Sequence, residues 1–165
     1  MSCKIASYRR VVIVVWGKPQ LTDVPRVVSA VKAAHDKFGP VVFIARMPSW
    51  SEPPPEAVQK EISRNTPAFL DSCVSQHIVF EGEGFASAAK RLALAGIIFV
   101  TARRVGHFVH AKVEEVAERV PAVAKADVEV AMQQFRTDGL LDRYIEGLTP
   151  EQFIQDERFA FRRPR

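Results

Sequence analysis

The chain of 165 residues has a formal net charge of +4 and is 47% hydrophobic, a composition typical of one globular domain with a substantial core rather than of a polycationic nucleic-acid binder. Its two cysteines, Cys3 and Cys73, exclude a disulfide framework and a paired-cysteine metal site, and they favour a reducing compartment. The N-terminal apolar run from Val11 to Trp16 is too short for a signal sequence or a membrane-spanning helix, so we expect a cytoplasmic protein without a membrane partner.

The first half of the chain predicts two strands, each followed by a helix. The apolar run just described has no polar alternation, which indicates a strand buried on both faces. Residues 21–40 carry helix signals, because Thr22 or Asp23 can cap the helix and a Gly-Pro pair ends it. A second buried run, "VVFIARMP", leads into the proline-rich loop "PSWSEPPP" and a helix that begins near Pro55. We expect this helix to kink or end at Pro67.

The second half continues the alternation. "VSQHIVFEG" predicts a third strand, small residues after Phe85 predict a helix, and residues 107–110 predict a short strand before a helix with valines at helical spacing. Strands that alternate with helices imply an α/β fold with an open, mainly parallel sheet and crossover helices. We therefore expect an α/β domain over residues 1–122 and a C-terminal helical extension over 123–165, which ends in the basic tail "FAFRRPR".

The strand-to-helix junction "EGEGF" resembles a phosphate-binding loop in outline only. The dinucleotide fingerprint requires a third glycine where this chain has Ser87, and a P-loop requires a terminal Gly-Lys-Ser/Thr. Glu81 and Glu83 also place negative charge beside the amides that would hold a phosphate. We interpret the junction as a tight turn that needs a positive φ at Gly82 or Gly84, and we predict no cofactor there.

The four histidines do not form a recognisable metal or catalytic motif. His107 and His110 point to opposite faces if they lie on a strand, and His35 and His77 have no acidic or thiol neighbour at ligand spacing. No Gly-x-Ser-x-Gly elbow is present. We therefore predict no metal site and no catalytic residues, and a Cys73–His77 pair is the one nucleophilic alternative.

The order of these features resembles a known family. A buried strand ending in Trp16-Gly17 is followed by a capped helix, "VVFIARMP", a proline loop and helix, "QHIVFEGEGF" and "FVHAKVEEVAERV". Over residues 3–120 this order is similar to that of small bacterial STAS-like proteins of the SpoIIAA-like type. The resemblance implies a STAS-like sheet with helices and a non-enzymatic role as a regulatory switch or protein-interaction module. Some members of the family bind a small ligand or a nucleotide.

One branch of that family carries an Asp-Ser-x-Gly-like phosphoacceptor motif where a central strand meets the next helix. At that junction this chain reads "MPSWSEPPPE", which contains Ser49 and Ser51 but neither the Asp-Ser pair nor the glycine. We therefore do not transfer the phosphorylation mechanism. A serine at a helix entrance is typical of an N-cap, and we expect that role for Ser51.

The sequence thus predicts a non-enzymatic regulatory or protein-interaction module that contacts a protein partner, or a second copy of the chain, through strand-end loops and the C-terminal extension. The interaction residues that we predict are Trp50, Ser51, Glu83, Phe85, Phe159, Phe161, Arg162 and Arg163. The alternative is a small-molecule or nucleotide-binding domain with an apolar pocket at the same sheet edge, near Trp50 and Gly84. Nucleic-acid binding by the basic tail is a third hypothesis, which we do not expect.

Overall fold

The computed structural model describes residues 3–82 and 105–141, and they contain one five-stranded sheet. The strands follow the chain in the order β1-β2-β3-β4-β5. Their bounds are β1 Cys3–Tyr8, β2 Val11–Trp16, β3 Val41–Met47, β4 Cys73–Phe80 and β5 Gly106–His110. β1 pairs antiparallel with β2, and the other three pairs are parallel. The α/β fold with a mainly parallel sheet is therefore confirmed, with one antiparallel edge strand.

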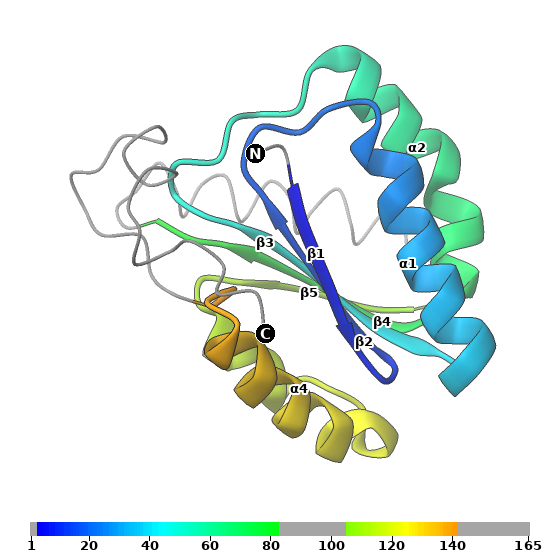
Figure 1. Ribbon diagram of the computed structural model, residues 1–165, viewed down its shortest axis with the longest axis vertical. Coiled ribbons are helices and arrows are strands. Elements are labelled where there is room, and N and C mark those ends of the chain that lie inside the picture. Colours follow the sequence, from blue (N-terminus) through cyan, green and yellow to red (C-terminus); the bar gives the residue numbers. More distant parts are fainter. Residues whose placement is uncertain (1–2, 83–104, 142–165) are drawn as a thin grey trace, which may run out of the picture.

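Helices cover both faces of this sheet (Figure 1). One face is covered by α1, Asp23–Phe38, and α2, Glu56–Asp71. The opposite face is covered by two short 3₁₀ helices, η1 Val113–Glu118 and η2 Ala122–Ala124, and by α4, Lys125–Thr137. The central strands are therefore buried on two sides, as parallel strands usually are.

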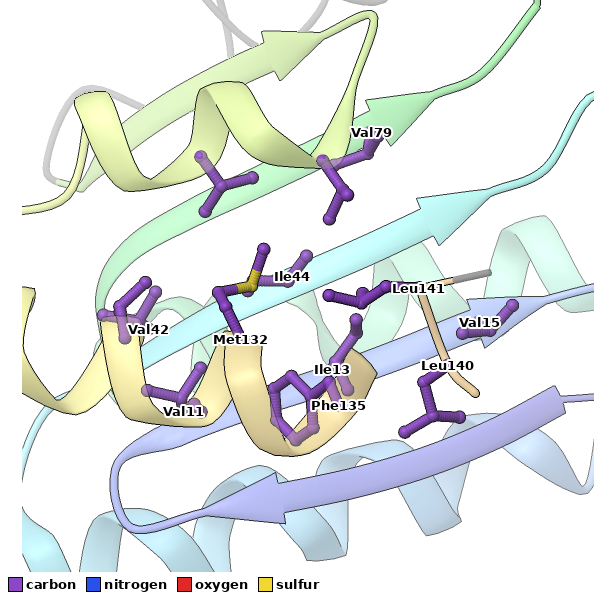
Figure 2. Packing of buried hydrophobic residues seen from close by; sticks show 14 of the residues in the cluster. Val11, Ile13, Val15, Val42, Ile44, Val79, Met132, Phe135, Leu140 and Leu141 are labelled. Carbon is purple, nitrogen blue, oxygen red and sulfur yellow. The ribbon is translucent and has the colours of Figure 1, made fainter. Parts of the chain in front are cut away.

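The β2 strand shows why its sequence does not alternate between apolar and polar residues. Val11, Ile13 and Val15 join the buried cluster under α4, where Figure 2 shows them opposite Met132 and Phe135. Val12 and Val14 join the cluster under α1. Successive side chains of a strand point to opposite faces, so a strand with two covered faces needs apolar residues throughout. The prediction of a doubly buried strand is confirmed.

The α4 helix contributes to the core of the sheet. Its inner face buries Val128, Ala131, Met132 and Phe135, and the side chain of Phe135 is only 1% exposed. Burial of an aromatic or aliphatic side chain of this size contributes about 1.5–3 kcal/mol. We expected the α/β domain to end at residue 122, before this helix. In the structure, α4 shares a hydrophobic cluster with β2, β3 and β4.

The N-terminus of α1 differs in detail from the prediction. The helix begins at Asp23, and Thr22 makes no side-chain cap. Instead, the Asp23 carboxylate accepts a hydrogen bond from the Gln20 amide at 2.9 Å, and the Asp23 amide donates to the Gln20 carbonyl at 3.0 Å. The carboxylate is 1% exposed and also accepts from Arg26. At the other end, Gly39 adopts φ +80, a conformation that glycine tolerates without strain.

Two further helix predictions need correction. The α2 helix continues past Pro67 to Asp71, so the end expected at this proline is wrong, whereas the alternative of a kink stays a prediction. The helix expected after residue 112 is present, but it is a 3₁₀ helix over Val113–Glu118 and does not reach Val120. Pro121 disfavours a helical conformation at the residue before it. Valines three residues apart, Val113 and Val116, also fall on one side of a 3₁₀ helix with three residues per turn, and both are buried.

Candidate functional site: an apolar cavity and its polar neighbours

A cavity of about 290 Å³ lies between α1, α2 and the sheet, close to the carboxyl ends of β2 and β3. Its walls are mainly apolar. They include Trp16 of β2, Val24 and Val27 of α1, Phe43 and Met47 of β3, and Phe69 of α2. In open α/β sheets ligands bind beside the carboxyl ends of the strands, so the cavity occupies the usual binding edge. This edge is where the sequence predicted a contact surface.

The loop after β3 closes this end of the cavity. The Ser51 hydroxyl donates to the Gly17 carbonyl at 3.3 Å, and the Glu52 amide donates to the same carbonyl at 2.9 Å. The Ser51 amide donates to the Pro48 carbonyl at 2.9 Å. The loop is thereby fixed to the end of β2. The N-cap role expected for Ser51 is wrong, because the N-cap position of α2 is Pro55 and the Ser51 side chain lines the cavity.

Among the predicted interaction residues, the structure describes Trp50 and Ser51. Trp50 is half-buried in this loop beside Ser51. The other six lie outside the described residues, namely Glu83, Phe85, Phe159, Phe161, Arg162 and Arg163. Gly84 lies outside them too, whereas Gly82 has φ +138 and confirms the predicted positive φ in the "EGEGF" turn.

A few polar side chains interrupt the apolar walls. On α2, the Asn65 amide nitrogen donates to the Glu61 carbonyl at 2.8 Å and to the Glu61 carboxylate at 2.9 Å. The Thr66 hydroxyl donates to the Ile62 carbonyl at 2.8 Å. Gln76 of β4 lines the cavity from the sheet side, and its side-chain amide carries both a donor and an acceptor. Gln76 therefore presents a donor and an acceptor to whatever occupies the cavity.

His107 lies beside Gln76. The two residues are register partners in the parallel β4–β5 ladder, so their backbones are about 4.8 Å apart and their side chains share a face. Both ring nitrogens of His107 are buried and have no hydrogen-bond partner in the described part of the chain. Burial lowers the pKa of His107, which keeps the ring neutral near pH 7. An unpaired buried polar group costs about 1–3 kcal/mol, so this one requires an explanation.

A second polar cluster lies on the opposite face of the same two strands, under η1. Ser75 Oγ is 3.0 Å from His77 Nε2, and His77 Nδ1 is 3.0 Å from His110 Nε2. His110 Nδ1 lies 3.7 Å from the Glu115 carboxylate, which also accepts a hydrogen bond from the Ala111 amide at 3.1 Å. Ser75 and His77 are fully buried, and His110 is 5% exposed.

The contacts of this cluster allow one consistent assignment of protons. If His110 Nδ1–H points at the Glu115 carboxylate, His110 Nε2 accepts from His77 Nδ1–H, and His77 Nε2 accepts from the Ser75 hydroxyl. Burial, followed by the neighbouring histidines, lowers the pKa of His77 to about 3. Burial also lowers the pKa of His110, although Glu115 acts in the opposite direction. The cluster therefore consists of two neutral rings that hydrogen-bond to each other and to Ser75.

The series Ser75–His77–His110–Glu115 resembles the arrangement that activates a catalytic serine, but it cannot act in that way. A nucleophile must reach its substrate, and Ser75 has no exposed surface. The Cys73–His77 alternative also fails, because Cys73 belongs to the cluster under α1, whereas His77 faces η1. Burial raises the pKa of both Cys3 and Cys73 to about 12, with the Asp23 carboxylate adding to the effect at Cys3. Neither thiol is a nucleophile at neutral pH.

A third polar cluster ties the "EGEGF" turn to α4. The buried Arg46 guanidinium of β3 binds the Glu81 carboxylate through Nε–Oε1 at 2.7 Å and Nη2–Oε2 at 3.0 Å. Its Nη1 donates to the Leu140 carbonyl just after α4. Glu81 is therefore engaged in a bidentate ion pair. The sequence interpretation, in which Glu81 acted only through its charge beside the turn amides, missed this pair.

Within residues 3–82 and 105–141, no three histidine, cysteine, aspartate or glutamate side chains come together in a way that could hold a metal ion. In the same part of the chain, no helix has the length and apolar character needed to cross a membrane. Comparison of the chain with protein-family models, with curated proteins and with solved structures finds no match.

Proposed function

We propose that the protein is a non-enzymatic binding module, in which the cavity between α1, α2 and the sheet takes a small, mainly apolar molecule. The observation that carries the proposal is a cavity of about 290 Å³ at the carboxyl edge of the sheet. Ligand sites are concave, mostly apolar, and contain a few placed polar groups. The walls of this cavity and the amide of Gln76 have that character.

The size of the cavity restricts the ligand. An apolar cavity of about 150 Å³ holds one benzene molecule, and this cavity has about twice that volume. A single ring with a short chain therefore fits, whereas a nucleotide would demand more space and a counter-charge for its phosphates. Glu52 is the only charged residue among the described lining residues, and its charge is negative. These features support an apolar ligand over the nucleotide alternative.

A regulatory role of the STAS-like type accompanies this proposal. It is supported by the order of elements, since two strands precede α1 and the sheet then grows by parallel strands. It is also supported by the half-buried Trp50 in the loop that closes the cavity. A ligand beneath this loop would alter the surface that a protein partner contacts, so ligand binding and partner binding would be coupled.

The test uses the two tryptophans of the chain. Trp50→Phe leaves Trp16, a cavity residue, as the only tryptophan, and butylbenzene serves as the apolar probe because it is transparent at 295 nm. Titration should change Trp16 fluorescence with a Kd of about 0.2 mM, which corresponds to about 0.5 kcal/mol for each of its ten carbons. Isothermal calorimetry with the unmodified protein provides an independent measurement.

Two matched variants test whether butylbenzene binds in the cavity. Thr66→Phe inserts a ring at a lining position of α2 and should abolish binding. Ala68→Phe adds the same ring two residues further along, at an exposed position, and should bind butylbenzene normally. Equal binding by both variants, or no binding of butylbenzene to the unmodified protein, would refute the proposed function. Circular dichroism confirms that each variant is folded.

A further inference from the structure

In the described part of the chain, the carboxyl edge of the sheet beside the cavity is poorly suited to an anion. Helices that follow parallel strands begin at this edge, and their N-termini attract negative charge. Here the first turns of α1 and α2 carry their own acids, Asp23 and Glu56. The Asp23 side chain is 1% exposed and accepts a hydrogen bond from the Gln20 amide. An anionic ligand would therefore meet a carboxylate at a place where other α/β folds present a free helix terminus.

Backbone amides of the loop that closes the cavity are also engaged. The Ser51 amide donates to the Pro48 carbonyl and the Glu52 amide donates to the Gly17 carbonyl, both at 2.9 Å. The described lining residues include neither a lysine nor an arginine. An anion that entered the cavity would thus lose its hydration without gaining a counter-charge from these residues, which is costly.

Glu52 makes the described wall of the cavity acidic. Its side chain is 54% exposed, so the cavity wall reaches solvent at this residue, and its carboxylate lies 3.4 Å from Lys18 Nζ. Lys18 is 71% exposed and lies outside the described lining, so water and salt weaken this ion pair. A cation at this end of the cavity would interact with the Glu52 carboxylate and would keep part of its own hydration.

We propose that the cavity binds an apolar amine, with its apolar body among the aromatic walls and its ammonium group beside Glu52. This inference rests on the proposed function, because it specifies the ligand of the same cavity. Trp16, Phe43 and Phe69 line the cavity from three different elements. Phe43 and Phe69 pack edge to face, with ring centroids 4.6 Å apart. An aryl group extends such packing, so an arylalkylamine matches both the apolar walls and the acidic end.

The experiment compares three probes that share a phenylbutyl body and differ in the charge of the head group at pH 7.5. The probes are the cation 4-phenylbutylamine, the neutral 4-phenylbutan-1-ol and the anion 4-phenylbutanoate. Calorimetry at low salt should show that the amine binds about three- to fivefold more tightly than the alcohol, as expected for an exposed ion pair. The carboxylate should bind at least about fivefold more weakly than the alcohol. Raising the salt to about 0.5 M should bring the amine close to the alcohol, because salt screens the charge of Glu52.

Charge variants of the Lys18–Glu52 pair should shift this preference in opposite directions. Glu52→Gln keeps the shape of the side chain and removes its charge, so the ratio of amine affinity to alcohol affinity should fall to about one. Lys18→Met removes the competing cation and should raise the same ratio by about twofold. Glu129→Gln is the matched control for Glu52→Gln. Glu129 is exposed on α4, which covers the opposite face of the sheet, so this variant should keep the ratio of the unmodified protein.

The outcomes separate this inference from the proposed function. If the carboxylate binds as tightly as the amine, if the amine binds no better than the alcohol, or if the preference survives Glu52→Gln, the inference is wrong. It is also wrong if Lys18→Met lowers the ratio or if Glu129→Gln lowers it as much as Glu52→Gln does. In each of these cases, binding of butylbenzene still supports the cavity as a ligand site. If neither butylbenzene nor any of the three probes binds, the proposed function fails and this inference fails with it.

Discussion

Replacement of Arg46 by methionine should be among the most destabilising single substitutions in the chain. The Arg46 side chain is 4% exposed, and it holds both oxygens of Glu81 as well as the Leu140 carbonyl. Methionine keeps the apolar stem but removes every donor. The Glu81 carboxylate, 18% exposed, would then lose its counter-charge, and the carbonyl that follows α4 would lose a donor.

The expected loss follows from these contacts. Removing one partner of a buried ion pair costs about 3–5 kcal/mol, and the partial exposure of Glu81 favours the lower end. An unsatisfied carbonyl adds about 1 kcal/mol, so the free energy of unfolding should fall by about 4 kcal/mol. For a chain of this length each kcal/mol shifts Tm by about 2–4 °C, which predicts a decrease of about 8–16 °C.

Urea unfolding followed by circular dichroism at 222 nm measures the loss by linear extrapolation. The double variant Arg46→Met/Glu81→Met should recover at least half of it, since an apolar pair often replaces a buried ion pair without net cost. Arg64→Met is the control, because the Arg64 side chain is 83% exposed, and it should cost less than about 0.5 kcal/mol. A loss below about 1 kcal/mol for Arg46→Met, or a double variant as unstable as the single one, would refute this reasoning.

Three other measurements follow from the buried groups. The folded pKa of His77, about 3, lies below the ordinary 6.5 because the ring is buried. The unfolded chain therefore binds the proton first, and stability should fall by roughly 1.4 kcal/mol per pH unit from pH 6.5 toward 3. His77→Leu should flatten urea-derived stability over this range. Cys3 and Cys73 should react with a thiol reagent at pH 7.5 only at the rate of unfolding, as timed absorbance against a urea-unfolded sample would show; rapid labelling of the folded protein would contradict their burial. Phe135→Ala should cost about 3–5 kcal/mol in the same urea assay if α4 belongs to the core of the sheet, whereas a loss below 1 kcal/mol would mean that α4 packs loosely.

The sequence predicted β2 and β3 well because their signal is local. β2 and β3 consist of uninterrupted apolar runs, and such runs form strands whose two faces are both covered. The punctuation around α1 is equally local, and the helix ends at the predicted glycine. The apolar runs of β2 and β3 could not show which elements cover each face of the sheet. The amphipathic pattern of α4 indicates a helix with one apolar side, but not that this side packs on β2 and β3.

The polar clusters were beyond sequence reasoning because they depend on strand register. Gln76 and His107 are 31 positions apart in number, and they become neighbours only because β4 and β5 pair in one particular alignment. A slip of one residue would exchange His107 for a residue of the opposite face. The pairing of Arg46 with Glu81 depends likewise on the register that sets Met47 beside Phe80. Residue types were visible in the sequence, but their partners were not.

Strand β4 separates two kinds of polar site by its alternation alone. Ser75 and His77 point under η1, where their polar atoms find partners in His110 and in each other. Gln76 points the other way, toward the cavity and beside His107. The rings of His77 and His110 are buried and hydrogen-bonded, whereas the ring nitrogens of the partly buried His107 have no partner within the described residues. The proposed ligand site therefore lies on the face of β4 that carries Gln76, and the triad-like serine cluster lies on the other face.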